Sequence, residues 1–521
     1  MTNADNLIAD AFLSEPLSIS MQEAAKIVGV SAATIRNWIK TGYLVSLHKG
    51  RITKDSLDSF MAETMGKEKL NSRANKREKD RHNHTALTWD TGQKVRLTTE
   101  NGDDLARSYE NSLSESHRNK EGIYYTPLNI IDDMLSSIPS DIGDSLFLDP
   151  CCGSGNFILS AIKLGFKPQN VYGFDTDENA IALTKKRIYD HSGFQSTTIV
   201  QGDFLKIAKK ETFKFDFIFT NPPWGKKMPA DDKENYAQLY ETGNSTDTSA
   251  LFFFASLACL SATGKLGFLL QEAFFNIATF QDARKAALNL SIERLIDYGK
   301  PFKGLLTKAQ AIILSNVPVE NALVNCELST ASHSRSLQSF RATPKTILNF
   351  WADEAAAEII SHVYATNHLT LTSNISWGLG IVTGNNAKYC QTQPQEGFIP
   401  VYKGPDIRKT GLEMPTAFIP KTLNLYQQVA PKELYEAPEK LIYKFISPKL
   451  CFYLDTEQKY LLNSANFLVP NSDFPLTGKQ LTDLLNSTFI NWLYQKIFYT
   501  PKVLRGDLAR LPIHNTYFNS C

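Results

Sequence analysis

The sequence predicts an α/β protein built on a doubly wound sheet of seven strands, with a small domain before it and a mixed α+β domain after it. Between residues 146 and 316, short β-branched or aromatic runs alternate with helical stretches, a pattern typical of parallel strands joined by crossover helices. A chain of 521 residues is also too long for one ordinary core. After about Ser315 the pattern changes to irregular strands and aromatic loops, which indicates a separate domain.

The composition is that of a soluble globular protein, with 42% hydrophobic and 21% charged residues. The net charge of +1 gives no general attraction to a polyanion, so any surface for nucleic acid must be locally basic. No secretory signal is visible, and the apolar stretch from Ala250 to Ala262 is too short to span a bilayer. Seven cysteines without a Cys-x-x-Cys pattern fit reduced thiols. We therefore expect a cytoplasmic protein with no membrane contact and no structural metal.

The first expected domain covers residues 17–64. Ser20 can cap a helix that begins at Gln22, a tight turn follows at Gly29, and a second helix runs over residues 32–40. The second helix would expose Arg36 and Lys40, which are therefore candidates for DNA contact. Together with a short wing, this segment resembles the winged helix-turn-helix of excisionase and mercury-resistance-regulator proteins. A helical hairpin for protein contacts is the alternative.

Residues 65–95 are expected to form a basic linker. Apolar residues nearly vanish between Gly66 and His84, while lysines and arginines accumulate with few acids between them. Such a charge run is usually only solvated, although a basic tether beside a DNA-reading module could also contact phosphates.

Seven strands are expected in the central region, and polar motifs follow several of them. The expected strands are residues 146–149, 171–175, 198–202, 215–220, 266–271, 292–298 and 309–314. In doubly wound sheets, ligands bind at the carboxyl ends of the strands. The sequence therefore predicts a ligand site at that edge.

A glycine loop and three acids form the first part of this site. Asp149 and the loop that contains Cys151, Gly153 and Gly155 follow a strand and open a helix, so a ligand can approach the backbone closely. The loop lacks the third glycine of the dinucleotide fingerprint and a Lys-Ser/Thr phosphate clamp, which argues against NAD and nucleoside triphosphates. At the next two strand ends lie Asp175, Asp203 and Phe204, which could hold a nucleoside.

The second part is the tetrapeptide Asn221-Pro222-Pro223-Trp224, which ends a strand. The side-chain oxygen of Asn221 and the carbonyl of Pro222 are acceptors that can grip one exocyclic amino group, and Trp224 can stack on the base that carries it. Taken alone, the tetrapeptide could be an ordinary proline turn with a buried tryptophan. Three acids at successive strand ends favour a site.

These motifs resemble those of the gamma class of amino-methylating DNA methyltransferases, which belong to restriction-modification systems and act on adenine. The resemblance spans most of the chain, and its first element is Tyr124-Tyr125-Thr126-Pro127. It implies a class I methyltransferase sheet over residues 105–330, with S-adenosylmethionine as cofactor. Its substrate would be the exocyclic N6 of a flipped adenine in double-stranded DNA.

The resemblance also implies a role for each matched residue. Thr126, Asp149 and the backbone of the loop from Cys151 through Gly153 to Gly155 would hold the methionine part of the cofactor. Asp175 would bind the ribose, and Asp203 and Phe204 would bind the adenine of the cofactor. Asn221 and Pro222 would bind the target amine, Pro223 would shape the turn, and Trp224 and Phe302 would stack on the target base. Direct displacement at the methyl group requires no covalent enzyme intermediate.

Residues 345–521 resemble the TaqI-like specificity domain of the same enzymes, which recognises the target sequence. Polar loops there carry four cations that can track phosphates, while some of the four read base edges: Lys403, Arg408, Lys409 and Lys444. The alternative is that several of these motifs only stabilise the fold.

Other functions remain open from the sequence. A cytosine-N4 methyltransferase would use the same site, and glutamine and ribosomal guanine methyltransferases carry a similar tetrapeptide, although they look shorter and lack the C-terminal domain. A DNA-binding regulator with a relict methylase fold is a different class. The chain shows no convincing endonuclease pattern, so we expect a separate cognate restriction endonuclease to cleave unmodified DNA. The N-terminal module could read its own promoter or grip the substrate.

Overall fold

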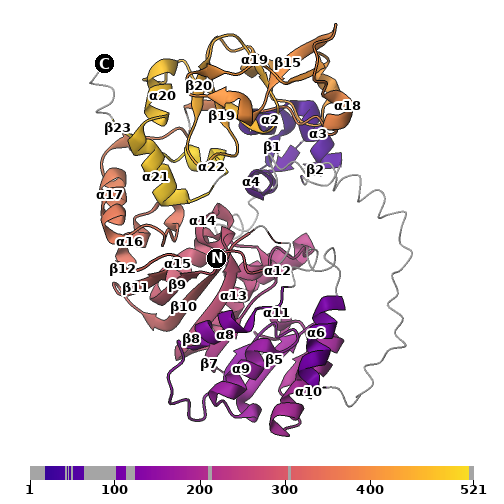
Figure 1. Ribbon diagram of the computed structural model, residues 1–521, viewed down its shortest axis with the longest axis vertical. Coiled ribbons are helices and arrows are strands. Elements are labelled where there is room, and N and C mark those ends of the chain that lie inside the picture. The colour runs from indigo at the N-terminus through magenta and orange to yellow at the C-terminus, as the bar shows by residue number, and fades with distance from the viewer. Residues whose placement is uncertain are drawn as a thin grey trace, which may run out of the picture. The chain divides into compact units, whose positions relative to one another are not determined.

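The computed structural model describes residues 18–40, 44, 46–48, 51–63, 101–112, 124–208, 214–302, 305, 307–372, 374–500 and 502–514. These residues form two compact units (Figure 1). One unit contains the described residues from 101 to 362. The other combines the described residues before 64 with those from 363 onward. The basic linker expected at residues 65–95 lies outside the described residues.

A nine-stranded sheet forms the centre of the first unit. Its strands are β4 (Phe147–Asp149), β5 (Val171–Asp175), β6 (Ile199–Gln201), β7 (Phe215–Thr220), β8 (Leu260–Gln271), β9 (Leu290–Asp297), β10 (Ala309–Pro318), β11 (Leu323–Glu327) and β12 (Ser332–Ser336). Their order is β12-β11-β9-β10-β8-β7-β4-β5-β6. The five neighbouring strands β6, β5, β4, β7 and β8 pair in parallel. By contrast, β10 is antiparallel to both β8 and β9. All seven expected strands are present, and the largest shift of a boundary is the earlier start of β8.

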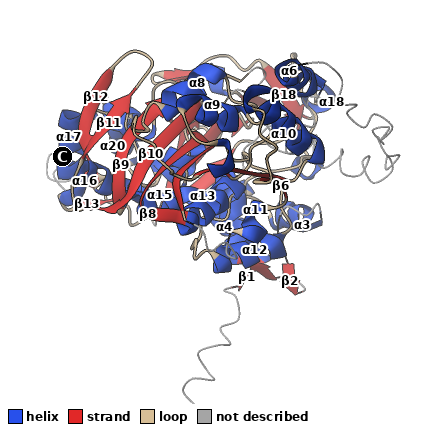
Figure 2. Ribbon diagram, turned by 90° about the horizontal axis from the view of Figure 1, so that it is seen from below, coloured by secondary structure: helices blue, strands red, loops and turns tan. Residues whose placement is uncertain are grey.

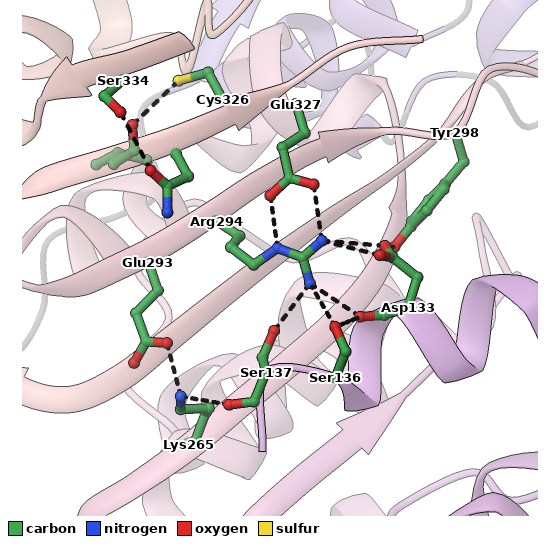
Figure 3. A network of polar contacts seen from close by, with 12 residues as sticks. Asp133, Ser136, Ser137, Lys265, Glu293, Arg294, Tyr298, Cys326, Glu327 and Ser334 are labelled. Atoms are coloured by element: carbon green, nitrogen blue, oxygen red, sulfur yellow. Dashed lines mark hydrogen bonds and ion pairs between the residues drawn. The ribbon is translucent and has the colours of Figure 1, made fainter. Parts of the chain in front are cut away.

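Two strands beyond the expected seven extend one edge of the sheet, so the change of pattern near Ser315 does not end it. β11 pairs in parallel with β9 and antiparallel with β12. Arg294 of β9 holds this edge: its guanidinium donates to the Glu327 carboxylate of β11 at 2.6 and 2.8 Å and to Asp133 at 3.1 Å (Figure 3). A short alternating segment does not reveal which strand it will pair with, so the sequence did not show this extension.

Helices cover both faces of the sheet and bury a separate apolar cluster on each (Figure 2). One face carries α8 (Leu128–Leu135), α9 (Asn156–Leu164) and α10 (Glu178–Ser192), and the other carries α13 (Thr248–Cys259) and α15 (Gln281–Leu288). The remaining helices are α6 (Gly102–Ser112), α11 (Phe204–Ile207), α12 (Ala230–Leu239), α14 (Ala273–Asn276), α16 (Leu337–Arg341) and α17 (Glu354–Ala365), with 3-10 turns η1 (Pro168–Asn170), η2 (Ala278–Phe280) and η3 (Pro344–Thr346). This is the doubly wound fold that the sequence predicts.

The N-terminal part of the second unit is a helix-turn-helix, as expected. Its elements are β1 (Ser18–Ser20), α2 (Met21–Val28), α3 (Ala32–Lys40), β2 (Ser46–His48), β3 (Arg51–Thr53) and α4 (Lys54–Glu63). Ser20 caps α2 because its hydroxyl accepts from the Glu23 amide at 3.1 Å, while the Glu23 carboxylate accepts from the Ser20 amide at 2.8 Å. Ile35 and Trp38 of α3 are fully buried.

The C-terminal part is mixed α+β, again as expected. Its strands are β13 (His368–Leu369), β14 (Ile375–Leu379), β15 (Phe398–Tyr402), β16 (Ile407–Arg408), β17 (Gly411–Leu412), β18 (Ala417–Pro420), β19 (Lys440–Lys444), β20 (Phe452–Asp455), β21 (Tyr460–Leu461), β22 (Ala465–Pro470) and β23 (Ile513–His514). Its helices are α18 (Asn386–Tyr389), α19 (Lys432–Tyr435), α20 (Gly478–Leu485), α21 (Thr488–Phe498) and α22 (Arg505–Leu508), with 3-10 turns η4 (Gly404–Asp406) and η5 (Leu423–Leu425). The largest sheet has the order β14-β22-β19-β20. Across the described ranges, no helix combines the length and apolar character that crossing a membrane requires.

Candidate functional site

A pocket opens at the carboxyl ends of β4, β5, β6 and β7, where the sequence places its polar motifs. Of the residues predicted for cofactor and target, those that line it are Thr126, Asp149, Cys151, Gly153, Asp175, Asp203, Phe204, Asn221 and Pro223. The pocket lining does not include Gly155, Pro222, Trp224 or Phe302. The pocket therefore gathers residues from four consecutive parallel strands because such strands end at one edge of the sheet.

Asp149 lies at the end of β4 with its side chain almost fully buried. Its carboxylate accepts from the Thr220 hydroxyl at 2.6 Å and from the Cys151 amide at 3.2 Å. Burial nevertheless raises the pKa of Asp149 to about 7, because the two hydrogen bonds only partly offset the loss of water around the charge. Asp149 thus carries a carboxyl group that changes charge near neutral pH.

The loop after Asp149 brings the backbone close to the pocket. Gly155 has a φ of +87°, and a Cβ at this position would lie 2.7 Å from the side chain of Thr184. Cys151 is placed with its sulfur 2.9 Å from Thr220 Oγ1. Burial raises the pKa of the Cys151 thiol well above its ordinary range. The thiol therefore stays protonated and is unsuited to act as a nucleophile.

Asp175 and Asp203 end the next two strand-loop segments. Asp175 accepts from the amides of Gly153 and Asp177, both at 2.9 Å, which ties the ends of β4 and β5 together. Asp203 caps α11 through the Leu205 amide at 3.1 Å, and its other oxygen accepts from the Tyr236 hydroxyl at 3.0 Å. Each carboxylate oxygen has more than one acceptor position, so both acids can still bind hydroxyl or amino groups of a ligand.

Phe204 is buried against two other phenylalanines on the floor of this part of the pocket. Its ring lies 5.8 Å from that of Phe174 and 5.9 Å from that of Phe252. Phe204 still contributes to the pocket lining. A flat ring that is fixed in this way offers an apolar face to a planar ligand.

Asn221 has an unusual hydrogen-bonding state. Its amide nitrogen donates to the Tyr124 carbonyl at 2.7 Å, which fixes the orientation of the side chain. Its side-chain oxygen is buried, and within the described part of the chain no donor reaches it. Leaving a buried acceptor unpaired costs about 1–3 kcal/mol. Such a group at a pocket wall is ready to accept a hydrogen bond from a ligand.

Trp224 and Phe302 lie together, although neither presents a free face. Their rings are 5.3 Å apart at 84°, and the Trp224 indole donates to the Leu269 carbonyl at 3.3 Å. Only 6% of Trp224 and 7% of Phe302 are exposed. Tyr124 packs against both and also lines the pocket. Stacking of Trp224 or Phe302 on a base therefore remains a prediction that requires this aromatic cluster to open.

Sequence reasoning missed several residues of the site. Tyr236 of α12 binds Asp203, Thr220 binds Asp149, and the Tyr124 carbonyl orients Asn221. From α6, Glu110 accepts from the Ser154 hydroxyl at 2.6 Å, and the Tyr109 hydroxyl donates to Asp177. Tyr124 and Thr220 border predicted motifs and could have been suspected, whereas α6 and α12 carry no local signal of a site.

The predicted DNA-binding cations lie in the other unit. Arg36 is exposed on α3, and the side chain of Lys40 lies outside the described residues. Arg408, Lys409 and Lys444 lie close enough to the Cys451 thiol to lower its pKa, against the larger, opposite effect of burial. Lys403 is partly buried and 3.5 Å from Thr416 Oγ1. Three of the cations thus gather around one point of the C-terminal domain.

Comparison with known proteins identifies the family. An N-6 DNA methylase model matches residues 100–297, a TaqI-like C-terminal specificity domain matches residues 399–513, and a helix-turn-helix domain matches residues 19–65. The chain is 47% identical over 395 residues to the type II methyltransferase M.VspI of Vibrio sp. (strain 343). The aligned region covers 76% of this chain and 97% of the relative. The chain belongs to the type II methyltransferases. It is a DNA methyltransferase of the restriction-modification kind. Its central domain, over residues 100–297, is that of the adenine-modifying N-6 methylases.

More distant proteins share parts of this methyltransferase. The type II methyltransferase M.AccI of Acinetobacter calcoaceticus is 27% identical over 235 residues, which is 44% of this chain and 39% of the relative. The structure of the type IIL restriction-modification enzyme MmeI in complex with DNA has a TM-score of 0.52 at 12% identity, over 79% of this chain and 70% of that one. The DrdV–DNA complex has a TM-score of 0.53 at 12% identity, over 95% and 67%. At this identity the two structures show a shared fold.

Proposed function

We propose that the methyltransferase moves a methyl group from S-adenosylmethionine to the N6 amine of an adenine that is flipped out of double-stranded DNA. One observation carries the proposal: the side-chain oxygen of Asn221 is buried at the pocket wall, and no donor among the described residues pairs with it. An exocyclic amine would satisfy this acceptor and remove the cost of leaving it unpaired. An enzyme that modifies a base must first take it out of the stack, which brings the amine to such a wall.

The pocket suits the proposed cofactor because its polar groups match the parts of that molecule. S-Adenosylmethionine supplies a methyl group on a positively charged sulfonium sulfur. Asp149, Thr126 and the backbone from Cys151 to Gly155 would hold the methionine part, and Asp175 would accept from the ribose hydroxyls. Asp203 would accept from the amino group of the cofactor adenine, with the fixed ring of Phe204 against its face.

The chain would activate the target amine by holding both of its hydrogens. The Asn221 oxygen would accept one hydrogen and the Pro222 carbonyl the other, which draws the nitrogen lone pair out of the ring and toward the methyl group. The hydrogen bond from Asn221 to the Tyr124 carbonyl prevents the amide from turning its nitrogen to the amine. Pro223 would shape the turn, and Trp224 and Phe302 would cover the base once the aromatic cluster opens. Positioning would supply most of the rate.

The remaining parts of the chain would deliver DNA to this pocket. We assign DNA contacts to Lys403, Arg408, Lys409 and Lys444 in the C-terminal domain of residues 345–521, and to Arg36 and Lys40 in the domain of residues 17–64. The methylase domain would cover residues 105–330. Cleavage of unmodified DNA would belong to a separate restriction endonuclease.

The test is methyl transfer from labelled S-adenosylmethionine to DNA from a strain without the gene, followed by single-molecule mapping of modified bases. We expect methylated adenine in one short motif. Asn221→Ala should lose about a hundred- to a thousandfold in turnover while it still binds the cofactor in equilibrium dialysis, since the interaction is needed in the transition state. Asn170→Ala, at the opposite edge of the sheet before β5, is the matched control. Methylated cytosine would indicate a cytosine-N4 methyltransferase instead. Absence of labelled DNA would favour the DNA-binding regulator.

A further inference from the structure

The helix-turn-helix and the C-terminal domain share one apolar core. Leu379 and Val382 of the C-terminal domain are buried in the same cluster as Val28, Ile35 and Trp38 of the helix-turn-helix. All five are at most 5% exposed. Burying such side chains contributes about 1.5–3 kcal/mol each. The two domains are therefore held together by a shared hydrophobic core.

Polar contacts fix the orientation of this interface. The Ser31 amide donates to the Val429 carbonyl at 2.9 Å. Arg505 donates to the Ile27 carbonyl at the end of α2, and its guanidinium lies 5.6 Å from the centre of the Trp377 ring. Backbone partners on both sides mean that the helix-turn-helix cannot slide along the sheet without losing hydrogen bonds.

Gly29 makes the close approach possible. It ends α2 with a φ of +72°, and a Cβ at this position would lie 1.8 Å from the Trp377 carbonyl oxygen. Any other residue would force α2 away from β14. The turn of the helix-turn-helix is therefore fitted to the C-terminal domain as well as to its own helices.

The strand register relates one cation of the C-terminal domain, Lys444, to the interface with the helix-turn-helix. Leu379 pairs with Asn466 on β22, and Asn466 pairs with Tyr443 on β19, directly before Lys444. Two strand spacings of about 4.8 Å separate Leu379 from Tyr443, which is about 10 Å. Lys444 therefore lies two strands away from the strand that packs against the helix-turn-helix. Arg36 is exposed on α3, next to the buried side chain of Ile35.

We propose that the helix-turn-helix and the C-terminal domain form one DNA-binding body, in which α3 contacts double-stranded DNA that flanks the methylation site within the same duplex. This inference rests on the proposed function, because it names a second contact to the DNA substrate of that reaction. It decides between the two roles that the sequence leaves open: the helix-turn-helix grips the substrate. It follows that part of the affinity of the methyltransferase depends on DNA outside its recognition sequence.

The test compares two duplexes that carry the mapped methylation motif, one with about 4 and one with about 20 flanking base pairs on each side. The full chain should bind the long duplex about 5–10 times more tightly than the short one at 0.15 M salt, because added phosphate contacts release counterions. Arg36→Ala should reduce that preference to about twofold or less and lower the salt slope on the long duplex by about 1. Lys479→Ala is the matched control, since α20 lies on the other side of the C-terminal domain from α3 (Figures 1 and 2).

Gly29→Ala tests the interface itself and should also remove the preference for the long duplex. Gly193→Ala is its control, because Gly193 ends α10 with a φ of +70° and a Cβ there would meet nothing within 4 Å. Arg36→Ala changes only an exposed side chain, so it remains decisive if Gly29→Ala unfolds the helix-turn-helix. A wild-type preference in Arg36→Ala would overturn the proposal, as would an effect confined to promoter DNA of the gene. Absence of methyl transfer by the wild-type chain would instead refute the proposed function.

Discussion

Replacing Asp149 with asparagine tests the buried carboxyl group at the end of β4. Its side chain is 2% exposed and accepts from Thr220 and Cys151. An asparagine oxygen can accept the same two hydrogen bonds, so Asp149→Asn removes the charge and keeps the shape. The comparison therefore isolates the free energy of ionising this group inside the protein.

The size and sign of the effect follow from its pKa. Burial raises the pKa of Asp149 from the ordinary value of 3.8 to about 7. Between these two values the folded chain holds a proton that the unfolded chain has released, so the free energy of unfolding falls as the pH rises from about 4 to about 7 and is level above that. A shift of roughly three pKa units corresponds to about 4 kcal/mol, as an order of magnitude. Asp149→Asn should match the wild type near pH 4 and be more stable by up to that amount at pH 8.

The assay is guanidinium unfolding of both proteins, monitored by tryptophan fluorescence at several pH values between 4 and 8. Groups other than Asp149 titrate in both proteins, so most of their contribution cancels in the difference. The variant should also bind S-adenosylmethionine more weakly at pH 8, because the charge that opposes folding is the one proposed to hold the cofactor. If the difference in free energy of unfolding between the two proteins is the same at every pH, Asp149 does not titrate near neutrality and the reasoning fails.

Two further substitutions test the sheet edge and the cofactor pocket. Arg294→Gln removes a guanidinium that is only 15% exposed and joins β9 to Glu327. We expect the free energy of unfolding to fall by about 2–3 kcal/mol, and amide hydrogen exchange to accelerate more in β11 than in β4. Equal acceleration in both strands would contradict the local role. Tyr236→Phe removes one hydrogen bond to Asp203, which should raise KM for S-adenosylmethionine about three- to tenfold with kcat nearly constant, and a fall in kcat alone would exclude this role.

The chemistry of the pocket could be predicted from the sequence because its residues are local. Asp149, Asp175, Asp203 and Asn221 each follow a strand that short apolar runs reveal, and parallel strands place their carboxyl ends at one edge. The pocket lining contains all four. The helices of the helix-turn-helix were equally predictable, because Ser20 and Gly29 mark the ends of α2 by local rules.

Long-range packing decided the features that the sequence did not show. No local pattern indicates that Arg294 would join β11 to the sheet or that Tyr236 would bind Asp203, because each pair is far apart in the chain. The burial of Trp224 against Phe302 depends on three separate segments that meet in the folded protein.

By itself, the sequence determined the type of sheet, the acids at its strand ends and the tetrapeptide at Asn221, since all of these depend on residues close together in the chain. Only the tertiary structure decided that the unpaired oxygen of Asn221 is buried, that the pKa of Asp149 lies near 7, and that the helix-turn-helix packs into the core of the C-terminal domain. Hydrogen bonding, desolvation and domain packing depend on which distant groups surround a residue, and folding alone brings those groups together.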